Sequence, residues 1–189
     1  MAQLPTPLFT PRLTLRRPVL DDLDDLVLIF EREDVCRYLY WEPRDRNATL
    51  AVLTNRLERT ESLELDKVIN VVVERRDEGG VIGDFMLHWK EDEHRQGEIG
   101  GSIHPDHHGR GYAVEIYEAL LTLAFDVYQL HRVVGRCDAR NTASIRSLEK
   151  SGLRQEAHLI ENEFVKGEWT DEVIMAIRQA EWELLRRAS

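Results

Sequence analysis

The six residues 108–113, His-Gly-Arg-Gly-Tyr-Ala, constrain what this chain can fold into more than any other segment. They follow a stretch that ends in Ile103 and precede one whose apolar residues have helical spacing. Two glycines allow a tight turn and a close approach of the backbone to a ligand. The first N–H groups of the helix would point into the same turn, where the helix dipole favours negative charge. A strand, a glycine turn and a helix start together predict a pyrophosphate site, and the alternative is a turn that only caps the helix.

The charge and cysteine content of the 189 residues narrow the expected partners. The net charge of −10 argues against nucleic acid, because phosphate backbones need a basic face, and it is compatible with a cationic amine substrate. Cys36 and Cys137 lack metal-ligand spacing, which predicts buried thiols in a reducing cytosol and no metal site. With no apolar run of membrane-spanning length and no signal-peptide core, we expect a cytoplasmic protein without a membrane partner.

Hydrophobic periodicity predicts one mixed α/β domain over residues 10–189, preceded by an N-terminal extension over residues 1–9. Seven strands are expected, at 12–17, 67–75, 81–90, 97–104, 133–138, 155–164 and 169–177. Helices are expected at 20–30, at 35–39, after a cap at Asn47 or Thr49, and at 111–128, 144–151 and 179–187. Hairpin turns are expected at Gly79-Gly80 and Lys166-Gly167, and a charged loop at 91–95.

Four stretches of the sequence, one of which contains the glycine turn, carry recognisable motifs. They are Leu13 to Arg17 with the acidic helix after it, Ile103 to Ala113, Asn141 to Ile145 leading to Lys150 to Leu153, and Gly167 to Asp171. In these stretches the sequence resembles the GCN5-related N-acetyltransferase (GNAT) superfamily, and within it the RimJ/RimL-like branch. The superfamily's phosphate motif is matched at Gly111 and Ala113, whereas His108 stands where the motif has Gln or Arg.

The resemblance implies a mostly antiparallel sheet of seven strands, splayed between the fourth and fifth strands and flanked by helices. Acetyl-CoA, as the cosubstrate, would lie in this V-shaped gap. Its pantetheine would pair with the backbone near Ile103, and Asn141 would bridge to the pantetheine amide, unless Asn141 only forms an Asx-turn before a helix. Its pyrophosphate would rest on His108, Gly109, Arg110, Gly111, Tyr112 and Ala113.

Acetyl transfer to an amine needs a neutral nucleophile, yet alkyl amines have a pKa of about 10.4 and arrive protonated. A carboxylate near the acceptor is therefore expected to take the proton. The resemblance points to Glu98 on the fourth strand and to Glu163, the position of the base in RimL-like enzymes. We favour Glu163 slightly; the alternative for each is a solvated strand glutamate.

The departing sulfur needs a hydrogen-bond or proton donor. Many members of the superfamily place a tyrosine at the position occupied here by Leu148, which cannot donate a proton. RimL-like enzymes instead have a serine that matches Ser144. The alternative is that Ser144 only satisfies a backbone N–H at a helix start.

Two groups of side chains carry weaker expectations. Tyr38, Tyr40 and Trp41 could form an aromatic wall for the acceptor or pack in the core. The acidic residues at 21, 22, 24 and 25 are expected on a solvated helix face.

The resemblance thus implies an acetyl-CoA-dependent N-acetyltransferase that acts on a primary amine, at a protein N-terminus or on a small molecule, by direct attack in a ternary complex. A polyamine, amino-sugar or antibiotic acetyltransferase is the alternative within the same chemistry. A non-catalytic acyl-CoA-binding module is the other alternative, because of the leucine at 148. Many relatives dimerise, so a homodimer is among the expected assemblies.

Overall fold

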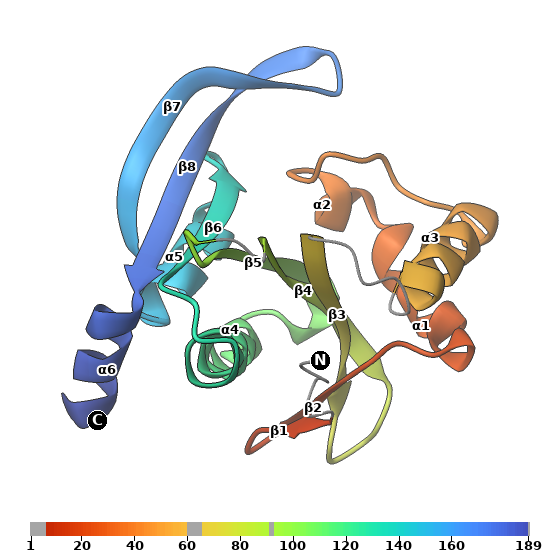
Figure 1. The fold of residues 1–189 in the computed structure, drawn as a ribbon. Helices are drawn as coiled ribbons and strands as arrows, with labels where there is room; N and C mark the ends of the chain where they lie inside the picture. The colour runs from red at the N-terminus through yellow and green to blue at the C-terminus, as the bar shows by residue number, and fades with distance from the viewer. Residues whose placement is uncertain (1–6, 60–65, 91–92, 189) are drawn as a thin grey trace.

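The computed structural model describes residues 7–59, 66–90 and 93–188, and these form one eight-stranded sheet flanked by helices (Figure 1). The strand order is β1-β2-β3-β4-β5-β6-β8-β7, and every neighbouring pair is antiparallel except β5 and β6. The strands are β1 Leu8–Phe9, β2 Leu13–Arg16, β3 Asp66–Arg75, β4 Val81–Lys90, β5 Gln96–Ile103, β6 Arg132–Asp138, β7 Arg154–Val165 and β8 Glu168–Arg178.

The helices cover both faces of the sheet. They are η1 Leu20–Asp22, α1 Leu23–Phe30, α2 Glu33–Cys36, α3 Arg46–Arg59, η2 Pro105–His107, α4 Tyr112–Thr122, the π-helical turn η3 Leu123–Val127, α5 Thr142–Lys150 and α6 Gln179–Ala188. Alternation along β3 sends Val71 and Val73 into the larger core, which α4 covers, and Val72 into a smaller core under α1 and α3. No helix among the described residues is long and apolar enough to cross a membrane.

The expected α/β fold is confirmed, with one strand more than the seven expected. Residues 8 and 9, which we assigned to an extension, form β1 and pair with Leu15 and Thr14. The domain boundary at residue 10 stays a prediction, as does the loop at 91–95, of which residues 91–92 lie outside the described residues. Both hairpin turns adopt the positive φ that glycine favours, at Gly79 and Gly80 and again at Gly167.

Three local expectations were wrong. The cap of α3 is Asp45, whose carboxylate accepts the N–H of Ala48 at 2.8 Å, rather than Asn47 or Thr49. Asp22 does not face solvent, because it is 4% exposed and binds Arg16 at 2.7 Å. Asp25 is not merely solvated either, since it accepts the N–H of Val81 at 2.8 Å. A short carboxylate satisfied by a distant segment cannot be recognised from helical spacing alone.

Candidate active site

Strands β5 and β6 run side by side for only three residue pairs. Gln96, Gly97 and Glu98 pair with residues 132–134, and the two strands then separate. Beyond Glu98, β5 continues to pair with β4 on its other side as far as Ile103, while β6 continues along β8. The edge of β5 from residue 99 onward therefore has unpaired backbone groups, which can hydrogen-bond an extended ligand.

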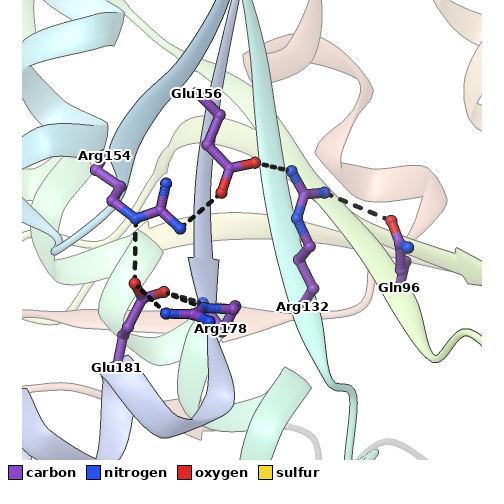
Figure 2. A network of polar contacts seen from close by, with 6 residues as sticks. All are labelled: Gln96, Arg132, Arg154, Glu156, Arg178 and Glu181. Carbon is purple, nitrogen blue, oxygen red and sulfur yellow. Dashed lines mark hydrogen bonds and ion pairs between the residues drawn. The ribbon is translucent and has the colours of Figure 1, made fainter.

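A network of ion pairs holds the closed end of this strand pair (Figure 2). Arg132 on β6 contacts Gln96 of β5 at 3.4 Å and forms an ion pair with Glu156 of β7. Arg154 continues the network to Glu156 at 2.7 Å and to Glu181 of α6 at 3.1 Å. The network joins β5, β6, β7 and α6 at the paired end of β5 and β6, before the two strands separate.

The glycine turn lies between β5 and α4, as predicted. Gly109 and Gly111 have φ of +73° and +78°, and a Cβ on Gly109 would meet no atom within 4 Å. Gly111 is the N-cap of α4, and no side chain caps this helix start. Within the described part of the chain, the N–H groups of residues 109–111 have no hydrogen-bond acceptor. The turn therefore presents free amides beside open space at a helix N-terminus, which is the geometry that binds phosphate.

His108 differs from the glycines that follow it. Its N–H donates to the carbonyl of Pro105 at 3.0 Å, and its ring Nε2 lies 2.9 Å from the carbonyl oxygen of Ile103. The backbone N–H and the ring of His108 thus have partners within the protein, and the carbonyl of Ile103 is in contact with that ring. The sequence alone does not show this contact, because it depends on how tightly the loop folds back onto β5.

An arginine that sequence reasoning missed holds the glycine turn in place. Arg12, just before β2, donates to the carbonyl of Arg110 at 2.8 Å and binds Glu115 in the first turn of α4 at 2.6 Å. Its guanidinium also stacks over Tyr112, 4.5 Å from the ring centre. These contacts tie the N-terminal strands to the turn, so its shape depends on a residue almost 100 positions away in the chain.

Carboxylates gather where β5 and β6 separate. Arg136 of β6 lies 3.5 Å from Glu98 and 3.2 Å from Glu172 of β8. Burial raises the pKa of Glu98, and the charge of Arg136 offsets only part of this shift. Glu172 is 2% exposed and was not among the predicted site residues. In the sequence it stands beside Asp171 in the polar first half of β8, so no local signal singles it out.

Glu163 belongs to the same neighbourhood. It pairs with Thr170 across the β7–β8 hairpin, and Asn162 beside it donates to Glu172 at 2.9 Å. Burial and then the charges of three nearby carboxylates, Glu172, Glu163 and Glu98, raise the pKa of Tyr40 to about 12. The two glutamates predicted from the sequence therefore lie near one tyrosine ring.

The three aromatic residues after α2 have separate surroundings. Tyr40 is near the carboxylates, whereas Trp41 lies under the guanidinium of Arg44, 4.4 Å from its ring centre. The guanidinium groups of Arg37 and Arg140 lie 5.3 Å and 6.0 Å from the centre of the Tyr38 ring. Of the three, the acceptor-wall hypothesis is best supported for Tyr40.

The start of α5 brings Asn141 and Ser144 together. The side-chain oxygen of Asn141 accepts the N–H of Ser144 at 3.1 Å, so Asn141 is the cap and Ser144 is not. The Ser144 hydroxyl lies 3.2 Å from the sulfur of Cys137 on β6. Leu148 is 1% exposed and packs against Gly135, where an added Cβ would lie 2.8 Å from a Leu148 methyl group. Leu148 therefore belongs to the core.

No group of three or more His, Cys, Asp or Glu side chains in the described ranges is arranged to hold a metal ion. Cys36 and Cys137 are free, buried thiols.

Comparisons with known proteins agree with this geometry. The profile of the Acetyltransferase (GNAT) domain matches residues 12–154, which include β5, the glycine turn and α5. The chain belongs to the GNAT acetyltransferases. As a member of this family it is an N-acetyltransferase, and its resemblance to the superfamily is confirmed.

Two curated relatives and one solved structure show how far the similarity extends. The chain is 35% identical over 107 residues to the uncharacterized N-acetyltransferase YnaD of Bacillus subtilis, covering 57% of this chain and 62% of the relative. It is 27% identical over 178 residues to the uncharacterized N-acetyltransferase p20 of Bacillus licheniformis. This match covers 93% of this chain and 97% of that relative. The crystal structure of spermidine N-acetyltransferase from Vibrio cholerae in complex with CoA and spermine is 25% identical, with a TM-score of 0.76 over 92% of this chain and 99% of that one.

Proposed function

We propose that this enzyme transfers the acetyl group of acetyl-CoA to a primary amine, on a protein N-terminus or a small molecule, by direct attack in a ternary complex. The observation that carries the proposal is the free edge of β5 next to a glycine turn whose amides have no acceptor in the described residues. The two free, buried thiols are consistent with a reducing cytoplasm as the place of the reaction.

The residues present fit acetyl-CoA. Gly109, Arg110 and Gly111 would hold the pyrophosphate through their N–H groups, together with the first amides of α4 at Tyr112 and Ala113. A side chain at 109 would project into this space, and glycine leaves it open. Asn141 retains its side-chain NH₂ for the pantetheine, since only its oxygen is used in the cap. Bound there, acetyl-CoA supplies an acetyl group activated as a thioester.

Glu98 is the base that the surroundings support best. It lies where β5 and β6 separate, and its raised pKa makes it a better proton acceptor than an exposed glutamate. Arg136 lies 3.5 Å from one oxygen of this carboxylate. Glu163, which the sequence favoured slightly, lies on the hairpin opposite and is the alternative base. Ser144 is the proposed hydrogen-bond donor to the sulfur.

A polyamine acceptor is favoured by one specific observation. The charges of Glu172, Glu163 and Glu98 all raise the pKa of Tyr40, and Arg136 contacts Glu98 and Glu172. An acceptor with two or more ammonium groups would gain from this excess of negative charge. The solved relative in complex with CoA and spermine supports the same class of acceptor.

A direct test is to incubate the purified protein with acetyl-CoA and a panel of amines, and to measure release of the CoA thiol. The panel contains spermidine, spermine, an amino sugar and peptides with free N-termini. We expect amine-dependent release, fastest with the polyamines. CoA binding without thiol release for any amine would instead support a non-catalytic acyl-CoA-binding module and contradict the proposal.

A further inference from the structure

The guanidinium of Arg136 lies between two carboxylates that belong to different strands. Its Nη1 donates to both oxygens of Glu172 on β8, at 3.2 Å and 3.3 Å. Its Nε lies 3.5 Å from an oxygen of Glu98 on β5. The contact with Glu172 is therefore the tighter of the two, and the planar fork of one arginine reaches the strands on both sides of β6.

Glu172 has a second donor that fixes its carboxylate. The side-chain NH₂ of Asn162 on β7 donates to Glu172 at 2.9 Å. Because the side chain of Glu172 is almost fully buried, its carboxylate depends on donors from the protein. Arg136 on β6 and Asn162 on β7 thus hold this carboxylate from the two strands that flank β8.

An irregularity in β7 brings Asn162 to this place. The pairing register of β7 with β8 shifts between Leu159 and Glu163. Within the shifted segment, Glu161 has φ of +46°, which is uncommon for a residue other than glycine. The carboxylate of Asp171 stabilises the bulge by accepting the N–H of Glu161 at 2.9 Å. Bulges beside active sites re-aim side chains, and this one aims Asn162 at the buried carboxylate.

The charges around Glu98 oppose one another. Burial is the largest influence and raises the pKa of Glu98. The charge of Arg136, followed by that of His88 across the β4–β5 pair, lowers this pKa, and the charge of Glu172 raises it. Tyr40, in the loop after α2, is near the same carboxylates. A shift of Arg136 toward Glu98 would therefore make Glu98 a weaker base, and a shift away would make it a stronger one.

We propose that Glu172 is a positioning residue, which holds Arg136 on the β8 side and so keeps it from pairing fully with Glu98. This inference rests on the proposed function, in which Glu98 takes the proton of the amine. As the nitrogen attacks the thioester, the carbon–nitrogen bond forms and the carbon–sulfur bond breaks with its electron pair on sulfur, and the proton from nitrogen passes to Glu98. Glu172 and Arg136 exchange no proton. Their contact determines how basic Glu98 is when the amine arrives.

The most direct test follows the protonation of Glu98 itself, without ligands. Protein labelled with carbon-13 at the glutamate side-chain carboxyl carbons is titrated by NMR, and the Glu98 signal is the one lost in Glu98→Gln. Glu172→Gln weakens the hold on Arg136, which then pairs fully with Glu98, so the midpoint of the Glu98 titration should fall by about one pH unit.

The opposite shift is expected for Arg136→Gln. Loss of the cation should raise the Glu98 midpoint by about one pH unit. Arg136 is half-exposed, and the new amide can still donate to Glu172, so the buried carboxylate keeps a partner and the fold should be retained.

Glu172→Asp separates positioning from charge. It keeps the negative charge but shortens the side chain, so the carboxylate no longer holds Arg136 in its present place. If Glu172 positions Arg136, the Glu98 midpoint should fall by about half a pH unit. A role through charge alone would leave the midpoint at its wild-type value.

Kinetics give a second readout. The acid limb of kcat/KM should move to lower pH in Glu172→Gln and to higher pH in Arg136→Gln, while the KM for acetyl-CoA changes by less than about twofold. Glu74→Gln is the matched control, since Glu74 also contacts an arginine, Arg16, at 2.9 Å, but lies on β3, which does not border β5. It should leave the Glu98 midpoint and the acid limb unchanged.

The inference is overturned if Glu172→Asp leaves the Glu98 midpoint at the wild-type value, or if Arg136→Gln does not raise it. Failure of the proposed function has a different signature, since the wild-type protein would then release no thiol with any amine. The NMR titration does not depend on turnover and would still report how Arg136 is shared.

Discussion

The two ends of the β5–β6 strand pair are built in opposite ways. At the closed end, three backbone pairs and the contact of Arg132 with Gln96 join the strands, and Glu156 and Arg154 extend the contacts to β7 (Figure 2). At the open end, β5 has no strand partner on that side among the described residues, and the neighbouring glycine turn has free amides. Side chains thus close one end, while backbone groups are left available at the other.

This difference separates structural residues from functional ones. Surface ion pairs contribute little individually, so the closed end should tolerate substitution. Only proline removes a backbone N–H, so any other substitution at the open end acts where its new side chain blocks the approach of a ligand. Glu98 is the last residue of β5 that pairs with β6, and its side chain lies where the open end begins.

The largest effect is expected for Glu98→Gln, at the point where the two ends meet. Loss of the base should lower kcat by about 10²- to 10³-fold. Because the pKa of Glu98 is raised, wild-type kcat/KM should fall as the pH drops through a value above the ordinary glutamate pKa, and this acid limb should be absent in the variant. Steady-state kinetics across pH measure both, with Glu163→Gln as the comparison. A larger loss of kcat in Glu163→Gln would mean that Glu163, on the β7–β8 hairpin, is the base.

A smaller effect is expected for Leu148→Tyr, which restores the tyrosine common in the superfamily. Leu148 packs against Gly135 without room for a larger side chain. Overpacking should destabilise the fold by about 1–3 kcal/mol without increasing kcat. Thermal or urea unfolding measures the change, with the exposed Leu184→Tyr as control. An increase in kcat would show that the site accepts a second donor from this position.

At the open end, Gly109→Ala should weaken CoA binding about tenfold. The new Cβ projects into the space proposed for the pyrophosphate, and φ of +73° adds strain. Gly167→Ala is the matched control, because φ is +85° and no atom lies within 4 Å of the added Cβ. Calorimetric titration with CoA should show the loss only at 109, and equal affinity in both variants would contradict the site.

The smallest effect is expected at the closed end. Arg132→Met removes the contacts with Gln96 and Glu156 and should cost at most about 1 kcal/mol of stability, with less cost in high salt. Arg186→Met, which removes the ion pair of Arg186 with Asp126, should lower the stability by still less. Urea unfolding at two salt concentrations compares them. A drop in kcat of more than about twofold would mean that the closed end also positions the site.

Local patterns in the sequence were sufficient to predict most of the helices and strands, and the resemblance to the superfamily supplied the arrangement of the sheet. Alternation and helical spacing place the strands and helices, and the positive-φ glycines at 79, 80, 109, 111 and 167 mark turns. The position of the phosphate turn between β5 and α4 follows from the same local signals.

The environment of the catalytic groups could not be predicted in this way. Glu172 and Arg136 meet because β8 returns beside β6. Arg12 reaches the glycine turn from the first strands. Each contact joins segments far apart in the chain, and no spacing rule records them. The same reason explains why Asp25, which accepts the N–H of Val81, was wrongly expected to be solvated. Asp22 instead binds Arg16, which is near it in the chain.

Backbone amide hydrogen exchange, with and without CoA, tests the central claim most directly. If main-chain N–H groups of the turn hold the pyrophosphate and the free edge of β5 holds the pantetheine, CoA should slow exchange at residues 109–113 and 99–102. Residues 96–98, already paired with β6, should change little. Saturating CoA that slows exchange elsewhere and leaves residues 109–113 unchanged would contradict the account.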